Sequence, residues 1–315
     1  MSAPLLPPLQ SVFSPAGASA GAIASLSWVL IMGATLIFVA VMGLLAWAVS
    51  RRAVQRPVPA RLWIVGGGLV FPALVLGALM VYSKLHTPGW LERPPPGALV
   101  VGITAKMWWW EVRYRDPASG KEVVLANELH LPVGQPVWLG LSSADVIHSF
   151  WVPALGGKID MVPGRVGHLM VQADQAGSWR GQCAEFCGEQ HARMALHVVA
   201  HAPAEFDAWL AAQARPAAAP DSGLLENGRA AFLAQRCNAC HTIRGVAEES
   251  RLGPDLTHVG SRLYLGAGTL LNQPGAMAQW VAHTQNIKPG ARMPSSADMD
   301  TDTLKALVAW LEHLK

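Results

Sequence analysis

Charged residues are scarce in this 315-residue sequence, and acidic residues are absent from its first 83 positions. Lys, Arg, Asp and Glu make up 14% of the chain, hydrophobic residues make up 51%, and the mean hydropathy is positive. These proportions argue against an ordinary soluble protein. The 24 basic and 21 acidic residues nearly balance, and no stretch is basic enough to bind nucleic acid. We therefore expect membrane segments joined to small domains, without a nucleic-acid partner.

Cysteine is also scarce. The four cysteines form two close pairs, Cys183 with Cys187 and Cys237 with Cys240. Four are too few for a scaffold of this size to be built on disulfides. Close pairs are more typical of metal, redox or haem-attachment sites.

Two charge-free apolar runs lie near the N-terminus, over residues 22–49 and 62–83. As a helix, the second run extends about 33 Å at ~1.5 Å per residue, enough to cross a hydrocarbon core of about 30 Å. Buried helices of a soluble protein are the alternative, which such lengths without a charge disfavour. We predict a tail over residues 1–21 and a two-helix transmembrane hairpin over 22–83, with a kink at Pro72.

The basic residues of this region indicate a topology. All four arginines of the first 83 residues, Arg51, Arg52, Arg56 and Arg61, lie between the two apolar runs. By the positive-inside rule, the connection faces the cytoplasm and both termini face outward. A cleaved signal peptide fits poorly, because no basic residue precedes the first apolar run.

Residues 84–214 are predicted to form an all-β domain. Short segments rich in Val, Trp and Leu alternate with Gly, Pro, Asp and Ser, which is typical of a β-sandwich or barrel. The predicted strands are residues 98–104, 107–114, 122–126, 136–141, 146–151, 166–172 and 193–200, followed by a helix over 204–214. A flexible linker is predicted over residues 215–222. Residues 223–315 then form a small all-α domain, with helices over 224–236, 277–284 and 303–314.

The all-α domain contains the sequence Cys237-Asn238-Ala239-Cys240-His241. C-x-x-C-H is the pattern of covalent haem attachment, in which both thiols bond the porphyrin and the adjacent imidazole ligates iron. A thioredoxin-like pair would need a βαβ context, and a structural zinc site would need another pair of ligands. Neither is nearby, so we predict a c-type haem with His241 as an iron ligand.

The second axial ligand is expected downstream on a loop. Met293, in Lys-Pro-Gly-Ala-Arg-Met-Pro, is the best candidate. Ligation by His and Met raises the haem potential and suits electron transfer. Met293 could instead be a packing residue, with Met277, Met299, His258 and His283 as competing ligands.

A second group of donors lies in the β domain. Two thiolates, an imidazole and a thioether fall within twelve residues, at Cys183, Cys187, His191 and Met194, and His148 lies upstream. Soft sulfur donors with imidazole select copper, and two cysteines can bridge two metal ions. The alternative is a structural disulfide between the cysteines, with His191 and Met194 as packing residues. The remaining histidines of the domain, His130, His168, His197 and His201, are assigned no metal.

This donor set resembles the binuclear CuA motif of cytochrome c oxidase subunit II, C-x-E-x-C-x-x-x-H-x-x-M, with its upstream histidine in D-V-x-H-S-F-x-V-P. The resemblance implies a cupredoxin-like domain with bridging Cys183 and Cys187, terminal His148 and His191, a weak Met194 ligand and a ligating Glu185 carbonyl. It also implies that the Glu185 side chain binds magnesium at the interface with subunit I.

The C-terminal segment resembles class I cytochromes c. In that family a proline carbonyl accepts the N–H of the axial imidazole, a role that falls on Pro254. Nearly the whole chain therefore resembles subunit II with a fused cytochrome c, as in caa3-type haem-copper oxidases. This likeness implies an electron-input subunit that passes electrons from a donor through haem c and CuA to subunit I, where O2 is reduced to water.

The same resemblance implies the surroundings of the chain. It places a multi-pass protein in the lipid of the bacterial cytoplasmic membrane, with both C-terminal domains on the periplasmic side. Its expected partners are subunit I, subunit III and an external cytochrome c or membrane electron donor. A subunit of another respiratory reductase, and a copper-delivery or thiol-redox membrane protein with a haem domain, are the alternatives. Neither explains the hairpin, Met194 and the haem motif together.

Two further features bear on the resemblance. Met107-Trp108-Trp109-Trp110 corresponds to the aromatic cluster that admits electrons to CuA in subunit II, with Trp108 in that role. Trp109 and Trp110 could equally be core or interface residues, since successive strand residues face opposite sides.

Many subunits II carry a glutamate near the start of the second span, where this chain reads Pro59-Ala60-Arg61-Leu62-Trp63. The resemblance therefore does not extend to this glutamate at the proton-channel entry.

Overall fold

The computed structural model describes residues 10–50, 59–86, 93–248 and 250–315. The chain divides into two compact units, Ser19–Trp90 and the rest. Each unit is considered by itself.

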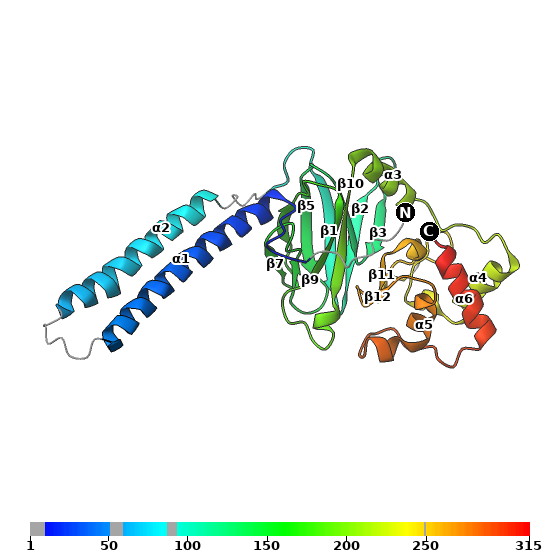
Figure 1. The fold of residues 1–315 in the computed structure, drawn as a ribbon. Coiled ribbons are helices and arrows are strands. Elements are labelled where there is room, and N and C mark those ends of the chain that lie inside the picture. Colours follow the sequence, from blue (N-terminus) through cyan, green and yellow to red (C-terminus); the bar gives the residue numbers. More distant parts are fainter. Residues whose placement is uncertain (1–9, 51–58, 87–92, 249) are drawn as a thin grey trace. The chain divides into compact units, whose positions relative to one another are not determined.

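The first unit is a helical hairpin. Helix α1 spans Ala18–Ser50, and after the connection the π-helical segment η1 (Leu62–Val70) leads directly into α2 (Phe71–His86) (Figure 1). Among the described residues, two such helical segments are long and apolar enough to cross a membrane. The change of winding occurs next to Pro72, which has no backbone N–H to donate. Arg51, Arg52 and Arg56, on which the predicted topology rests, lie outside the described residues.

The second unit begins with a β-sandwich that has a cupredoxin-like fold. Within the described residues, one sheet has the order β3-β2-β1-β5-β8 and the other the order β4-β10-β9-β6-β7. The first comprises β1 (Leu99–Lys106), β2 (Trp109–Arg115), β3 (Glu122–Ala126), β5 (Val137–Ser143) and β8 (Gly167–Val171). The second comprises β4 (Glu128–Pro132), β6 (His148–Trp151), β7 (Lys158–Met161), β9 (Gly177–Cys183) and β10 (Ala195–His201). Alternate residues of both sheets, such as Ile103, Leu139 and Phe150, fill one apolar core.

All seven strands predicted for this domain are present, but β4, β7 and β9 were not predicted. Strand β9 is rich in glycine and polar residues, so its composition resembles that of a loop. It is nevertheless held between β10 and β6, and its Trp179 and Cys183 point into the core. Helix α3 (Pro203–Gln213) closes the sandwich where a helix was expected.

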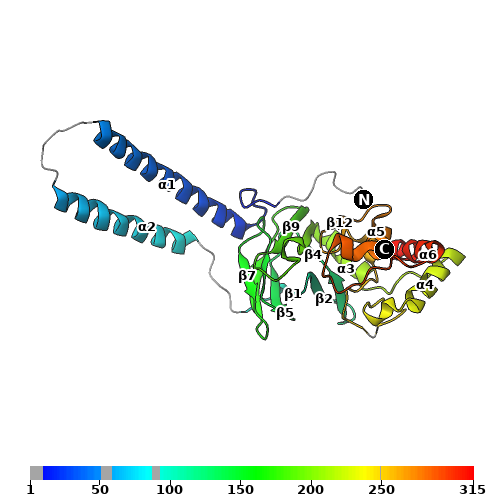
Figure 2. The same cartoon turned by 90° about the horizontal axis from the view of Figure 1, so that it is seen from below.

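The remainder of the second unit is an all-α domain built on the crossing of α4 (Gly223–Ala234) and α6 (Thr301–His313), which lie close together in Figures 1 and 2. A Cβ atom on Gly228 would lie 2.2 Å from the Ala306 carbonyl oxygen, so only glycine lets the helices approach this closely. Trp310 is fully buried against Phe232 at this crossing. Helix α5 (Ala276–Ile287) and the short hairpin β11–β12 (Tyr264–Leu265, Leu270–Leu271) complete the domain.

The segment between the two domains differs from the flexible coil that its composition suggested. The Ala217 N–H donates to the Arg244 carbonyl at 3.0 Å, and the Arg215 carbonyl accepts from His258 Nε2 at 3.1 Å. These contacts hold the segment along the all-α domain. The predicted domain boundaries at 84, 214 and 223 stay predictions.

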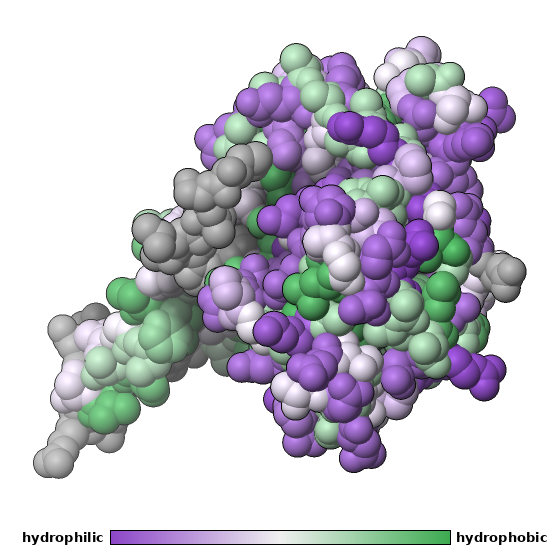
Figure 3. Space-filling model, turned by 90° about the vertical axis from the view of Figure 1, so that its right-hand side faces the viewer, coloured by the Kyte–Doolittle hydropathy of each residue, from purple (hydrophilic) through white to green (hydrophobic). Residues whose placement is uncertain are grey.

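Figure 3 shows that the visible face of this unit is mainly hydrophilic, with hydrophobic residues in small groups.

Candidate functional site

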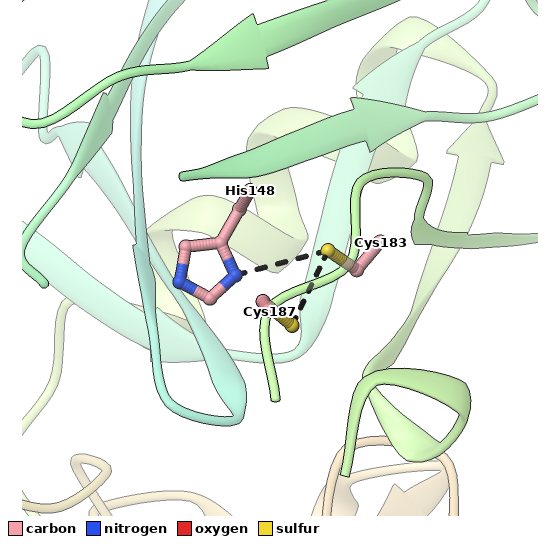
Figure 4. A group of neighbouring side chains, drawn as sticks. All are labelled: His148, Cys183 and Cys187. Atoms are coloured by element: carbon pink, nitrogen blue, oxygen red, sulfur yellow. Dashed lines mark hydrogen bonds between the residues drawn. The ribbon is translucent and has the colours of Figure 1, made fainter. Parts of the chain in front are cut away.

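The candidate copper ligands are brought together by the pairing of β6 with β9. His148 is the first residue of β6, Cys183 is the last of β9, and Phe150 pairs with Cys183 in the register. After β9 the chain forms a loop over residues 184–194, here called the copper loop. It carries Cys187 and ends in a 3₁₀ turn, His191–Arg193, before Met194. Figure 4 shows His148 extending from its strand toward Cys183 and Cys187.

The distances within this group are short. The sulfur atoms of Cys183 and Cys187 lie 3.7 Å apart, and both cysteines are free thiols. His148 Nδ1 lies 3.7 Å from Cys183 Sγ, and His191 Nδ1 lies 3.6 Å from Cys187 Sγ. Met194 Sδ is 3.9 Å from Cys187 Sγ, and the Glu185 carbonyl oxygen is 3.1 Å from Cys183 Sγ. Among the described residues, His148, Cys183 and Cys187 form a buried group with metal-ligand spacing.

Such an arrangement fits copper. Each imidazole approaches a different sulfur, and the two sulfurs lie close enough for both to contact the same pair of ions. The disulfide alternative is not what the structure contains, because a disulfide bond is about 2.05 Å long. Soft sulfur and imidazole donors in a buried pocket match the preference of copper over harder cations.

The two thiols are electrostatically linked. The hydrogen bond between them lowers the pKa of Cys183 to about 3, an effect that burial opposes and His148 assists. The same hydrogen bond and burial raise the pKa of Cys187. One proton therefore remains on the pair in the metal-free protein, and a metal ion that binds both sulfurs must displace it.

Asp145 orients the His148 ring, a role the sequence did not reveal. Its Oδ1 lies 2.8 Å from His148 Nε2, and its Oδ2 accepts the Met107 N–H at 2.8 Å. Burial raises the pKa of Asp145, but the hydrogen bonds from His148 and from backbone N–H groups outweigh it and hold the pKa below its usual value. The carboxylate therefore stays ionised and fixes Nδ1 toward the sulfur. A carboxylate three residues before the ligand was the only available signal.

The tryptophans occupy different environments. Trp108 is half-buried, and its indole Nε1 donates to the Cys187 carbonyl at 2.8 Å. Trp110 is fully buried in the core, edge-on to Phe150. Trp109 is half-buried, with the Lys106 ammonium 4.7 Å from its ring centroid. Of the three, Trp108 is thus hydrogen-bonded directly to the candidate copper loop.

The haem motif lies on a tight turn after α4. The 3₁₀ turn Cys237–Ala239 lets the N–H groups of Cys240 and His241 both bond to the Cys237 carbonyl, at 3.1 and 3.0 Å. His241 Nδ1 donates to the Pro254 carbonyl at 2.8 Å, which leaves Nε2 free for iron. Burial lowers the pKa of His241 against the effect of Pro254, and so favours the neutral imidazole that binds metal. This geometry fits a haem ligated by His241.

The competing axial ligands are placed very differently from one another. Met293 is half-buried on its loop and packs against the apolar core of the haem domain. Met277 is part of that core, and His258 is buried with its Nε2 bonded to the Arg215 carbonyl. His283 is exposed on α5. Met299 is half-buried, as Met293 is, so burial does not distinguish between these two candidates.

Comparison with known proteins identifies both domains. A family model described as "Cytochrome C oxidase subunit II, periplasmic domain" matches residues 116–201, and one described as "Cytochrome c" matches residues 225–315. The chain is 34% identical over 251 residues to cytochrome c oxidase subunit 2 of Alkalihalophilus pseudofirmus, covering 78% of this chain and 71% of that protein. It is 30% identical over 267 residues to the Bacillus subtilis protein of the same name, covering 78% and 73%.

This chain belongs to the cytochrome c oxidase subunit 2 family. It is a subunit of a cytochrome c oxidase, and it carries a fused C-terminal cytochrome c domain. Membership implies CuA copper, a haem and partnership with subunit I, and the apolar helices with a periplasmic-type domain fit a membrane protein. Among solved structures, the periplasmic domain of subunit II of the Bradyrhizobium japonicum cytochrome oxidase is 32% identical, with a TM-score of 0.35 over 38% of this chain and 95% of that one.

Proposed function

We propose that this oxidase subunit receives electrons from an external donor at a covalently attached haem c and passes them through a binuclear CuA centre to subunit I. Reduction of O2 to water then takes place in subunit I. When bound, the copper pair and the haem iron each accept and release one electron at a time. The residues of this chain hold both groups and set the environment in which they do so.

The observation that carries the proposal is the symmetry of the donors around the two sulfurs. Cys183 and Cys187 lie 3.7 Å apart, and each sulfur has its own imidazole within 3.7 Å. We assign the cysteines as bridges and His148 and His191 as terminal ligands. Met194 and the Glu185 carbonyl complete the set, one near each sulfur. Because His148 and both sulfurs are buried, water is kept from the site.

A copper-delivery or thiol-redox role is less consistent with these contacts. Delivery requires a ligand set that opens to release the ion, and thiol exchange requires an accessible sulfur. Here the Cys183 and Cys187 side chains are 3% and 4% exposed, and Met194 is 1% exposed beside them. Both sulfurs, His148 and Met194 are buried, and this favours a resident cofactor.

The haem assignment rests on the turn that presents Cys237, Cys240 and His241. We propose that both thiols form thioether bonds to the porphyrin and that Met293 is the sixth ligand. Pro254 orients the His241 ring through its carbonyl. Ligation by Met293 would raise the haem potential, as a relay toward oxygen requires.

The surroundings of the subunit follow from its family and its apolar helices. We propose a multi-pass protein of the bacterial cytoplasmic membrane, with α1 and α2 in lipid and both cofactor domains on the periplasmic side. Subunit III and an external cytochrome c or membrane donor are further proposed partners. We also propose that the half-buried Glu185 side chain contributes to a magnesium site facing subunit I.

Metal analysis of the full chain tests the ligand assignment. Expressed with haem-maturation machinery and copper, the full chain should contain about two copper ions and one haem. His148→Gln should lower the copper content and change its electron paramagnetic resonance (EPR) spectrum, whereas His168→Gln, on an exposed histidine, should change neither. One copper per chain with a blue-copper spectrum would overturn the binuclear assignment.

A relay test addresses the electron path. Cys183→Ser in the purified oxidase should leave the haem reducible by the donor but should stop donor-driven O2 consumption. If this variant consumed O2 at the wild-type rate, the copper centre would not be an obligatory relay and the proposed path would be wrong.

A further inference from the structure

Lys288 is an unusual lysine, because its ammonium group is buried between the haem domain and the copper domain. The residue follows α5 directly and is 3% exposed. Its Nζ donates to the carbonyl oxygens of Trp108, Arg193 and Gly266, at 2.8, 2.8 and 2.9 Å. Burial, with the nearby Arg193 charge, lowers the pKa of Lys288 to about 7, and the three carbonyl acceptors match the three N–H donors of its protonated form. Lysine is almost never buried without such pairing.

The three acceptors belong to different parts of the chain. Trp108 lies in the turn between β1 and β2, and Arg193 lies in the candidate copper loop next to Met194. Gly266 belongs to the β11–β12 hairpin of the haem domain. The Lys288 side chain thus bonds at once to the turn between β1 and β2, to the loop that carries the candidate copper ligands, and to the haem domain. In addition, the Arg193 side chain donates to the Ile287 carbonyl, beside Lys288.

The loop that follows Lys288 approaches the Trp108 ring. A Cβ atom on Gly290 would lie 3.7 Å from Trp108 Cζ3, and one on Gly188 of the copper loop would lie 3.1 Å from Trp108 Cζ2. Both glycines have positive φ, +74° and +111°, so each loop turns tightly where it meets the indole. The same loop carries Met293, and the indole N–H contacts Cys187. Trp108 therefore lies between the loop with the candidate haem ligand and the loop with the candidate copper ligands.

A separate set of contacts holds the haem domain on the copper domain. The Ala195 N–H donates to the Ala267 carbonyl at 3.0 Å, and the Tyr264 and His197 rings stack with centroids 4.0 Å apart. Glu128 accepts the Leu263 N–H at 2.6 Å. Because none of these contacts involves Lys288, its removal should loosen the loop near Trp108 without separating the domains.

We propose that Lys288 is a positioning residue that clamps the Met293 loop beside Trp108, making Trp108 the internal link between the haem and copper domains of one chain. This inference rests on the proposed electron path. With both groups bound, the haem would donate one electron to the copper centre. Lys288 would contribute only the position of the loop beside Trp108, with no bond made or broken. An external donor then docks on the haem domain rather than at Trp108.

Rapid-reduction kinetics in the full oxidase test the clamp. Lys288→Met keeps the length and apolar stem of the side chain but removes its donors. After photoreduction of the haem, copper reduction should slow about tenfold, equivalent to about 1.4 kcal/mol in the docking equilibrium. Lys305→Met, at an exposed lysine of α6, is the matched control and should keep the wild-type rate. An unchanged rate in Lys288→Met would overturn the proposal, as would a changed copper EPR spectrum, because the lysine would then act on the copper site itself.

Hydrogen exchange gives a readout that does not depend on electron transfer. In the full chain, with or without metal, peptides covering residues 107–109 and 286–291 should exchange faster in Lys288→Met than in Lys305→Met. Peptides covering β10, whose contacts with the haem domain do not involve Lys288, should exchange alike in both variants. Equal exchange at residues 286–291 would contradict the clamp even if the chain bound copper and haem as proposed. If the wild-type chain bound no copper, the proposed function would be wrong. The exchange result would still test whether Lys288 holds the loop at residues 286–291 against the copper domain.

Discussion

Asp145 Oδ1 lies 2.8 Å from Nε2 of His148, on the far side of the ring from the nitrogen that faces Cys183. This contact fixes both the ring orientation and the tautomer of a candidate ligand that is itself fully buried. Partners of this kind tune metal affinity without touching the metal.

Replacing Asp145 with Asn should therefore weaken copper binding by about 10- to 100-fold, because the amide orients the ring less strongly. Copper competition titration of the full chain would measure the affinity. Asp160→Asn, on the exposed face of neighbouring β7, is the control and should bind copper as the wild type does. Equal affinities for the two variants would show that the carboxylate has no role at the metal.

The axial-ligand assignment is tested at Met293. Met293→Leu should lower the haem reduction potential, since the thioether ligand raises it, and should leave the copper EPR spectrum intact. Met299→Leu is the matched control, because Met299 is also a half-buried loop methionine on the same core. Potentiometric titration would distinguish them. A lowered potential in Met299→Leu alone would transfer the assignment to that residue.

The crossing of α4 and α6 should not tolerate a methyl group at Gly228. Gly228→Ala places a Cβ 2.2 Å from a backbone oxygen of α6, so we expect a loss of about 1–3 kcal/mol in the free energy of unfolding of the haem domain. Gly223→Ala, whose Cβ would meet nothing within 4 Å, should be neutral or stabilising. Urea unfolding followed by haem absorption would measure both. A neutral Gly228→Ala would mean that the helices can separate at little cost.

Acid should destabilise the copper domain through two buried histidines. Burial lowers the pKa of His130 to about 4, although Glu128 acts the other way, and burial likewise lowers the pKa of His197 to about 4. Both remain neutral in the folded protein while the unfolded chain protonates near pH 6.5. Their contribution is therefore complete above pH 6.5 and is lost as the pH falls toward 4, by up to about 1.4 kcal/mol per pH unit for each histidine.

A difference measurement isolates this effect from acid release of metal. Glu128 and His201 face His130, and Glu128 and Arg180 act on His197. Urea unfolding between pH 7 and 4.5 should show a smaller loss of stability in His130→Gln and in His197→Gln than in the wild type. Parallel curves for all three proteins would show that these histidines do not titrate on unfolding.

Much of the chemistry of this chain could be predicted from short stretches of sequence. Cys183 to Met194 span twelve residues and Cys237 to His241 span five, so local spacing alone limits which cofactors they suit. The apolar spans and seven strands were predictable because hydropathy and periodicity are local properties. Strand β9 was missed because its glycines and polar residues acquire strand geometry from their neighbours in the sheet, not from their own propensity.

The relationships that depend on distant segments could not be predicted in this way. His148 reaches Cys183, 35 residues later, only because β6 pairs with β9. Lys288 and Trp108 are 180 residues apart, and nothing near a lysine in sequence marks it for burial. Burial of that amino group depends on which carbonyl groups the opposing surface offers. The amino-acid sequence thus determined the donor types and their local spacing, whereas the packing of one domain on the other decided which loop meets Trp108.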